Sequence, residues 1–359
     1  DFARCGGCHV QHLSQGAQIG TKTTVLTEAL HRIGRLETPS IEVVSGDPWG
    51  WRARIDLHWA HGHFGFYARH TRWMIEPEAC LIARPALSAL IPVLRRAVYA
   101  LRPSPCDIEA IESADGAVVL AVQCRPAEAP WFADQLSTIP GIAGVDAGSG
   151  RARQVRGNVR VLWPTLGPNG SPGMVEQDAR AFAQANAGLN PRLVGTIVDL
   201  AAPSPGEHVL ELYAGAGNVT VPLAATGANV TAVEGNAAAL ADAVVATGGA
   251  DGVRTIAGDA GAVAARLDEA GERFDVVVAD PPRTGFGPGV AQAIGRLASG
   301  DGARVVVCSC DPATLARDLA LVVAEAATHG RALRIDRAVV VDMFPQTWHI
   351  ETVVRLASL

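Results

Sequence analysis

From about residue 208 onward, short apolar runs alternate with longer segments of helical periodicity. We interpret the apolar runs as strands at 208–213, 229–233, 253–257, 274–280, 304–308, 334–341 and 349–356. Strands that alternate with helices predict an α/β fold with a mostly parallel, doubly wound sheet. Ligands bind to such sheets at the carboxyl ends of the strands, so the candidate site is expected there.

The first half of the chain has a different pattern. Apolar and polar residues alternate from Trp51 to Ala60, which predicts a half-buried strand and, with plausible turns after it, a β-meander over 51–76. A helix is predicted at 18–35 and a loop at 167–173. We therefore expect a smaller β-rich domain at 1–170 and an α/β domain at 171–359, with the first helix able to pack on the second domain.

The composition is that of a globular protein: 48% of the 359 residues are hydrophobic and 18% are charged. The sequence has no long uncharged apolar run and no segment resembling a signal peptide, so we expect a cytoplasmic protein without membrane contact. The net charge of −6 does not indicate nucleic-acid binding, but a local basic groove is compatible with it. Two arginine sets can form such a groove or an ordinary solvated surface: Arg52, Arg54, Arg69 and Arg72, and Arg151, Arg153, Arg156 and Arg160.

Glycines and acidic residues mark the ends of consecutive predicted strands. Gly215 and Gly217 follow the first strand, Glu234 ends the second and Asp259 follows the third. The third glycine of a dinucleotide fingerprint is absent, which favours an adenosine cofactor without a pyrophosphate. Each acid alone is more often a solvated turn residue, but the ordered set favours S-adenosylmethionine over NAD.

The fourth of these strands ends in Asp280-Pro-Pro-Arg283. Methyltransferases that act on exocyclic base amines carry an aromatic residue at the position of Arg283, so amine methylation is disfavoured. Asp280 is expected between cofactor and substrate.

Cys308 and Cys310 stand where the fifth strand ends. Asp311 has the character of a helix N-cap and Pro312 that of a first helical residue. A thiol just before a helix N-terminus is favoured as a thiolate. From position alone, however, both cysteines can equally be small buried apolar residues.

Six segments together resemble the RNA 5-methyluridine (uracil-C5) methyltransferase family. They are CGGCHVQHL (5–13), FAQAN (182–186), LELYAGAGN (210–218), DPPRTG (280–285), SCDPATLARDL (309–319) and DMFPQTWHIE (342–351). The resemblance covers nearly the whole chain and is nearest to the iron–sulfur-containing bacterial 23S ribosomal RNA branch. It implies a class I, Rossmann-like S-adenosylmethionine methyltransferase domain preceded by a β-rich domain with a cysteine cluster.

The resemblance also implies roles for single residues. Cys310 matches the nucleophile that adds to C6 of uracil, and Glu351 matches the base that removes the C5 proton. The residues matching the cofactor site are Gln184, Tyr213, Asn218, Glu234, Asp259 and Asp280, beside the glycines 215 and 217. Cys308 has no counterpart and is taken as structural, while Asp311 stands where asparagine is usual.

Cys5, Cys8 and the distant Cys80 resemble the family's [4Fe–4S] site, whose fourth ligand is expected just before Asp1. Thiolates also suit zinc, and a lone C-x-x-C can be redox-active. We expect a monomer that acts on RNA, ribosomal RNA being favoured over transfer RNA. A transfer RNA enzyme, a C5-cytosine methyltransferase and a non-catalytic, cluster-bearing RNA-binding protein remain as alternatives.

Overall fold

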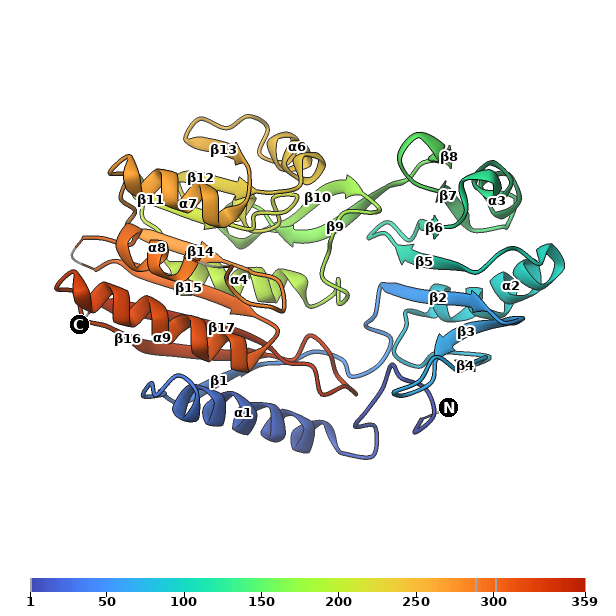
Figure 1. The fold of residues 1–359 in the computed structure, drawn as a ribbon, viewed down its shortest axis with the longest axis horizontal. Helices are drawn as coiled ribbons and strands as arrows, with labels where there is room; N and C mark the ends of the chain where they lie inside the picture. Colours follow the sequence, from blue (N-terminus) through green and yellow to red (C-terminus); the bar gives the residue numbers. More distant parts are fainter. Residues whose placement is uncertain (1, 288, 301, 359) are drawn as a thin grey trace.

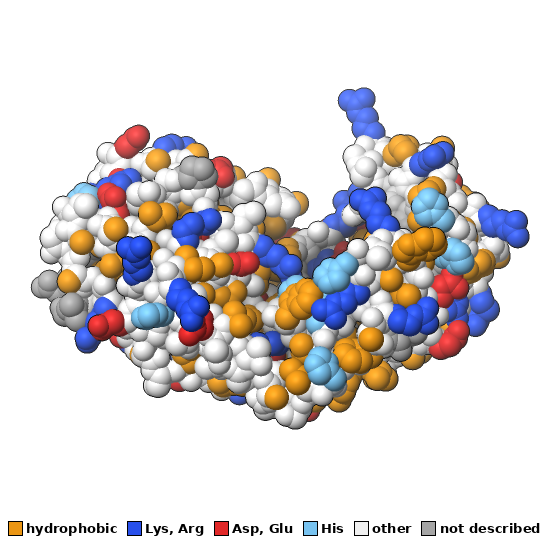
Figure 2. All heavy atoms as spheres, turned by 60° about the horizontal axis from the view of Figure 1, so that its bottom comes forward, with side chains coloured by type: hydrophobic (Ala, Val, Ile, Leu, Met, Phe, Trp, Pro, Cys, Tyr) orange, Lys and Arg blue, Asp and Glu red, His pale blue; other side chains and the backbone are white. Residues whose placement is uncertain are grey.

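The computed structural model describes residues 2–287, 289–300 and 302–358, which form two lobes joined by a hairpin (Figure 1). A space-filling view shows a hollow between the lobes (Figure 2). Within the described ranges, no helix has the length and apolar character needed to cross a membrane.

The larger lobe is built on an eight-stranded sheet. Its strands are β1 Ile41–Val44, β11 His208–Leu212, β12 Asn229–Glu234, β13 Val253–Ala257, β14 Val276–Ala279, β15 Arg304–Ser309, β16 Leu333–Val341 and β17 Glu351–Ser358. The order across the sheet is β1-β16-β17-β15-β14-β11-β12-β13, and β17 alone of these strands runs antiparallel to its neighbours. The predicted doubly wound sheet is confirmed.

The strand order places a binding crevice beside β11. The chain continues from β11 to β12 and β13 on one side and then returns to β14 on the other. The strand order reverses at this point, and ligands of doubly wound sheets bind outside the carboxyl ends of the strands at such a reversal. The ends of β11 and β14 therefore border the candidate site.

Helices cover both faces of this sheet. One face packs against α1 Gln15–Arg32, α7 Ala260–Glu269, α8 Val290–Leu297 and α9 Pro312–Thr328, and the other against α4 Asn190–Ala201 and α5 Thr220–Ala224. The helix α6 Ala237–Ala246 lies beside β12, β13 and the hairpin. Because side chains of a strand alternate between faces, Val277 enters the first core and Val276 and Val278 enter the second.

The smaller lobe is a seven-stranded sheet covered by two helices. Its strands are β2 Arg54–Ala60, β3 His63–Tyr67, β4 Met74–Ile75, β5 Cys106–Glu112, β6 Val118–Gln123, β7 Ile142–Ala147 and β8 Gln154–Gly157, in the order β4-β3-β2-β5-β6-β7-β8. The helices are α2 Pro85–Leu101 and α3 Ala129–Leu136, with 3₁₀ turns at η1 Pro126–Glu128 and η2 Gly150–Ala152. The meander predicted over 51–76 is present as β2, β3 and β4.

The hairpin joins the lobes and revises one prediction. It consists of β9 Arg160–Leu166 and β10 Pro172–Asp178, connected by η3 Pro168–Gly170. The loop predicted at 167–173 is therefore a hairpin turn, and its last two residues are already in a strand.

Two N-terminal elements pack on the larger lobe. α1 begins at Gln15, after the Ser14 cap, and contributes Leu26 and Leu30 to the core that α9 also lines. β1, which the sequence pattern did not predict, pairs in parallel with β16. The larger lobe thus includes chain from both ends of the sequence.

Candidate active site

Cys310 lies in the turn between β15 and α9, at the carboxyl edge of the eight-stranded sheet. Asp311 caps α9, because its Oδ1 accepts the N–H groups of Ala313 and Thr314 at 3.0 and 2.9 Å. Pro312 follows as the first helical residue. The predicted capping arrangement is confirmed.

The helix N-terminus does not lower the pKa of Cys310 as the sequence led us to expect. Burial raises the pKa of the thiol to about 11, the charge of Glu351 adds to the rise, and the nearby Arg283 guanidinium opposes it. The desolvation of the thiol thus outweighs the helix N-terminus, whose first N–H groups already donate to the Asp311 carboxylate. Arg283 instead supplies positive charge to the thiol.

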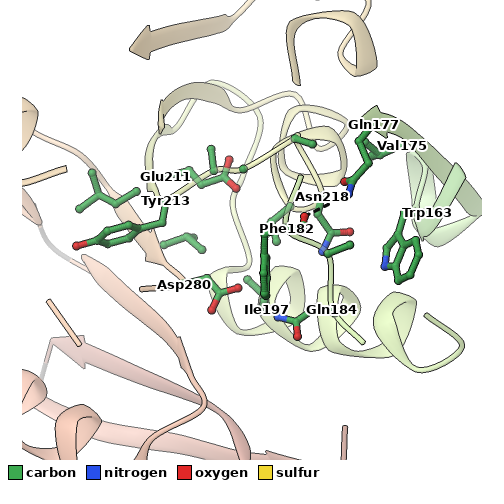
Figure 3. A pocket seen from close by; sticks show the side chains of 17 residues that line it. Trp163, Val175, Gln177, Phe182, Gln184, Ile197, Glu211, Tyr213, Asn218 and Asp280 are labelled. Carbon is green, nitrogen blue, oxygen red and sulfur yellow. Dashed lines mark hydrogen bonds between the residues drawn. The ribbon is translucent and has the colours of Figure 1, made fainter. Parts of the chain in front are cut away.

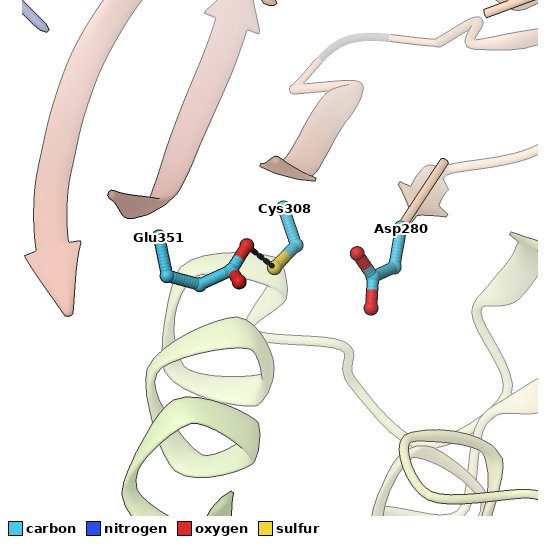
Figure 4. A group of neighbouring side chains, drawn as sticks. All are labelled: Asp280, Cys308 and Glu351. Atoms are coloured by element: carbon cyan, nitrogen blue, oxygen red, sulfur yellow. Dashed lines mark hydrogen bonds between the residues drawn. The ribbon is translucent and has the colours of Figure 1, made fainter. Parts of the chain in front are cut away.

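Asp280, Cys308 and Glu351 form a cluster of neighbouring side chains (Figure 4), and the charges of both carboxylates act on the Cys310 thiol. One ligand atom from each lies within 4.8 Å of the others, and the Cys308 thiol donates a hydrogen bond to Glu351 Oε1 at 3.4 Å. Burial raises the pKa of Asp280 to about 6. Burial, with the Asp280 charge next, raises the pKa of Glu351 well above its usual value. Buried like charges disfavour each other, so the cluster tends to retain a proton.

Cys308 therefore has a polar partner that the sequence did not reveal. It was expected to be structural, and it is fully buried in β15. The available signal was its place near the end of the strand, two residues before Cys310. Its thiol contacts the carboxylate that the sequence proposed as the base.

A cavity of about 600 Å³ brings the catalytic and cofactor candidates together. Cys310 lines it from the turn after β15, and Glu351 lines it from β17. The cofactor candidates that line the same cavity are Gln184, Tyr213, Gly215, Glu234 and Asp280. Residues separated by more than 160 positions in the sequence thus face one space.

The turn after β11 has an unusual backbone that opens space for a ligand. Tyr213 has a φ of 65°, a left-handed conformation that is costly for a bulky residue and that concentrates at functional sites. Gly215, with a φ of 57°, has open space where a Cβ would stand. At Gly217 a Cβ would lie 3.1 Å from the Cα of Ala243, so glycine allows α6 to approach. The turn can accept a cofactor against its backbone.

A narrower cavity continues from this turn toward the hairpin (Figure 3). Gln184, Tyr213, Asn218 and Asp280 line it, together with Phe182. Phe182 lines both cavities and is 78% exposed, so its ring is available for stacking. It belongs to the FAQAN segment, but the sequence interpretation gave it no role.

Asn218 has side-chain contacts that hold the turn in place. Its Oδ1 accepts a hydrogen bond from Asn190 Nδ2 at 2.7 Å, and its Nδ2 donates to Asn190 Oδ1 at 3.1 Å. The Thr165 hydroxyl of β9 donates to the Asn218 carbonyl at 2.6 Å. Asn218 thus fixes the hairpin and α4 against the candidate cofactor turn.

The two acids at the ends of β12 and β13 lie in different surroundings. Glu234 lines the larger cavity, and its oxygens accept the N–H groups of Gly215 and Asn236 at 2.8 and 2.7 Å. Asp259 caps α7 by accepting the N–H of Ala262 at 3.0 Å. In the described part of the chain, Asp259 lines neither of the two cavities. Of these two cofactor candidates, Glu234 faces the larger cavity and Asp259 does not.

Cys5, Cys8 and Cys80 line one separate cavity of about 390 Å³ in the smaller lobe. All three are free thiols. Burial raises the pKa of Cys8 to about 11, and the proximity of Cys80 adds to that rise. The structure thus brings the three predicted ligands together, and this donor set suits a group that binds several thiolates.

Most arginines of the two predicted basic patches are paired within the protein. Arg54 is buried, donating to Glu109 at 2.7 Å and to the carbonyl of Ala181, so its expected exposure is wrong. Arg153, Arg156 and Arg160 pair with carboxylates. Arg52 does line the active-site cavity.

Comparison with known proteins agrees with this geometry. The family model described as tRNA (uracil-5-)-methyltransferase matches residues 151–358. The 23S rRNA (uracil(1939)-C(5))-methyltransferase RlmD of Thiobacillus denitrificans is 33% identical, over 98% of this chain and 83% of that protein. The RlmD protein of Chromohalobacter salexigens is 35% identical, over 99% of this chain and 74% of that protein.

A solved structure is similar in fold. The tRNA (uracil-54, C5)-methyltransferase of Pyrococcus abyssi, in complex with S-adenosyl-L-homocysteine, has a TM-score of 0.72 at 23% identity, covering 98% of this chain and 85% of that one. The resemblance drawn from six sequence segments is confirmed. The chain belongs to the uracil-5-methyltransferase family of RNA-modifying enzymes.

Proposed function

We propose that the protein methylates C5 of a uridine in RNA, with S-adenosylmethionine as methyl donor and 23S ribosomal RNA as the favoured substrate. One observation carries the proposal: Cys310 and Glu351 line the same cavity as the strand-end residues Tyr213, Gly215 and Glu234. The choice of ribosomal RNA follows the 23S rRNA methyltransferases that match nearly the whole chain.

The chemistry begins at Cys310, because C5 of uracil is a weak nucleophile until C6 is attacked. The thiolate adds to C6, and the electron pair of the C5–C6 double bond moves into an enolate over C5, C4 and O4. C5 would then form a bond to the methyl group that the cofactor supplies as an electrophile, while the methyl–sulfur bond breaks and its electron pair leaves with S-adenosylhomocysteine. Arg283, beside the thiol, stabilises the thiolate form that must add.

Glu351 completes the reaction by accepting the proton on C5. The electron pair of the broken C5–H bond re-forms the C5–C6 double bond. The C6–S bond then breaks and returns the Cys310 thiolate. The raised pKa of Glu351 suits the removal of a proton from carbon, since a stronger base makes that transfer more favourable. Phe182, exposed at the mouth, offers a face on which the target base can stack.

The experiment is methylation of RNA by the purified protein, followed by mapping of 5-methyluridine. We expect 5-methyluridine in a 23S ribosomal RNA transcript. If 5-methyluridine formed in transfer RNA alone, transfer RNA would replace ribosomal RNA as the proposed substrate. If it formed in neither RNA, the proposed function would be rejected. Cys310→Ala should abolish both product and covalent adduct. Glu351→Gln should accumulate adduct on a denaturing gel, because methyl transfer can proceed while proton removal cannot.

The cysteine cavity is the basis of a second part of the proposal. Cys5, Cys8 and Cys80 are proposed as three ligands of a [4Fe–4S] cluster, which would supply structural cross-linking of the N-terminal segment to the loop before α2. Anaerobic protein whose chain extends upstream of residue 1 should contain iron and sulfide in equal amounts and lose both in Cys80→Ser. Zinc without sulfide would contradict the cluster.

A further inference from the structure

A group of stacked rings lies outside the catalytic cavity, and we call it the Trp348 cluster: His9, Arg69, His70 and Trp348. The His9 ring stacks on Trp348 with centroids 3.7 Å apart and planes 9° apart. The Arg69 guanidinium carbon lies over the Trp348 ring, 5.1 Å from its centroid. The His70 ring is 6.2 Å away at an interplanar angle of 30°. The cluster joins three segments: the Cys8 loop, the β3–β4 turn and the β16–β17 loop.

The rings are not what holds these segments in place. The N–H groups of His9 and Val10 donate to the Gln346 carbonyl at 2.9 and 3.2 Å. Gln18 also bonds Gln346 twice, from its amide to the Gln346 side chain and from the Gln346 N–H to its own oxygen. These hydrogen bonds tie the Cys8 loop and α1 to the β16–β17 loop, and the Arg69 N–H of the β3–β4 turn donates to the Arg4 carbonyl at 3.0 Å. Since the segments are already joined in this way, the stacking of Trp348 calls for another explanation.

The Trp348 cluster is exposed through Trp348 and His70, whereas the His9 ring that stacks on the indole is buried. Trp348 is 47% exposed, and Trp73 at the end of the same β3–β4 turn is 79% exposed. His70 and Arg72 of this turn are exposed as well. Lys, Arg and His side chains gather beside apolar ones on the face next to the hollow between the lobes (Figure 2). Exposed rings interleaved with cations suit the bases and phosphates of single-stranded RNA.

The position of the cluster relates it to the target base. Trp348 directly precedes His349, whose Nδ1 lies 3.5 Å from the Arg283 guanidinium. Arg283 in turn faces the Cys310 thiol and lines the active-site cavity. Adjacent residues are 3.8 Å apart along the backbone, so the backbone of Trp348 is one residue from a side chain that contacts Arg283 of that cavity.

We propose that the Trp348 cluster is a stacking platform for an unpaired RNA base that flanks the target uridine. This rests on the proposed function. An enzyme that modifies a base must take it out of its stack, and the neighbouring base then loses a stacking partner. The platform replaces that partner and so offsets part of the cost of unstacking. Arg69 adds positive charge beside the phosphate that links the two nucleotides.

The test is a double-mutant cycle between Trp348 and the RNA. RNA oligonucleotides carrying the target uridine would each have one flanking nucleotide made abasic, and their Kd values would be measured by fluorescence anisotropy. For the unaltered protein, one abasic position should weaken binding by about 5- to 100-fold. Trp348→Ala should weaken the binding of intact RNA by a similar factor. Its Kd should no longer depend on whether that position is abasic.

Three variants make the result specific. Trp348→Phe keeps a ring and should retain sensitivity to the abasic position. His70→Ala, on an exposed turn, should reduce that sensitivity without affecting folding. Trp131→Ala on α3, remote in sequence from all three segments, should leave RNA binding unchanged. Melting temperature and calorimetric binding of S-adenosylmethionine would verify that each variant folds.

The outcomes separate this inference from the proposed function. If Trp348→Ala and the unaltered protein were equally sensitive to the abasic position, the platform would be overturned. The same would follow if every abasic RNA lost the same affinity for the unaltered protein. The cycle measures binding only, whereas failure of the proposed function would appear as a lack of 5-methyluridine with the unaltered protein.

Discussion

Cys310 and Glu351 act in their deprotonated forms, and the structure raises the pKa of both. The pKa of Cys310 is about 11, and that of Glu351 lies well above its usual value. A group that must lose a proton and has a raised pKa is mostly inactive at low pH and becomes active as the pH rises. We therefore expect kcat/KM to rise with pH toward the pKa of Cys310 at about 11, without a falling limb on the alkaline side.

Arg283 provides the control for this pH dependence. Its guanidinium opposes the rise in the pKa of Cys310, so Arg283→Gln should move the increase in adduct formation to higher pH. Rapid-quench measurements with RNA containing 5-fluorouridine would isolate adduct formation. Fluorine at C5 cannot leave as a cation, so the adduct cannot be resolved. An unchanged profile in Arg283→Gln would show that another group sets the state of the thiol.

Cys308 should affect the second half of the reaction. Cys308→Val keeps a small apolar side chain in β15 but removes the hydrogen bond to Glu351 Oε1. The carboxyl group then lacks its orienting partner, so proton removal should slow by about tenfold, near the worth of one hydrogen bond. Release of tritium from [5-³H]uridine in RNA measures this step. Cys308→Ser, which retains a donor, should be less affected.

At the scale of elements, the Asp311 cap supports the turn that carries the nucleophile. Asp311→Ala removes the acceptor for two N–H groups of α9 and should lower the free energy of unfolding by about 1 kcal/mol. Asp311→Asn keeps an oxygen in the same place and should remain within a few tenths of a kcal/mol of the parent. Urea denaturation would compare the two. Equal stability of all three proteins would contradict a capping role.

The sequence predicted the elements whose signals are local. The strand at 253–257 and the Asp311–Pro312 start of α9 follow from apolar runs and capping residues, which depend on neighbouring positions. The four-residue strand β1 was missed because its partner β16 lies at the far end of the chain. Arg54 was assigned to an exposed face because a period of two does not show which face another segment covers.

The candidate site was predictable to a similar extent. Motif order located Cys310, Glu351 and most of the residues that line the cavity. It did not reveal the hydrogen bond from Cys308 to Glu351, because this contact joins two strands distant in sequence. Nor did it reveal that Asp259 caps α7 outside both cavities. Side-chain contacts across elements depend on packing, which a single sequence does not encode locally.

At the scale of the molecule, a buried ion pair holds the first helix to the catalytic sheet. Lys22 Nζ of α1 lies 2.6 Å from Asp342 Oδ1, and both side chains are almost fully buried. Lys22→Met leaves the Asp342 carboxylate without its charge partner. The free energy of unfolding should therefore fall by about 3–5 kcal/mol. The double variant Lys22→Met/Asp342→Leu should recover most of that loss. Thermal unfolding of the three proteins would test this.

The pairing of β1 with β16 also has a consequence for biosynthesis. Protein synthesis delivers β1 first, and its partner strand follows roughly 300 residues later. Until then, β1 lacks its sheet partner and α1 lacks the apolar surface of α9. Without β1, β16 would be an open sheet edge able to pair with other chains. The large lobe thus reaches its final form only after β16 has been synthesised, and chaperone binding to the waiting N-terminal segment is most useful during that interval.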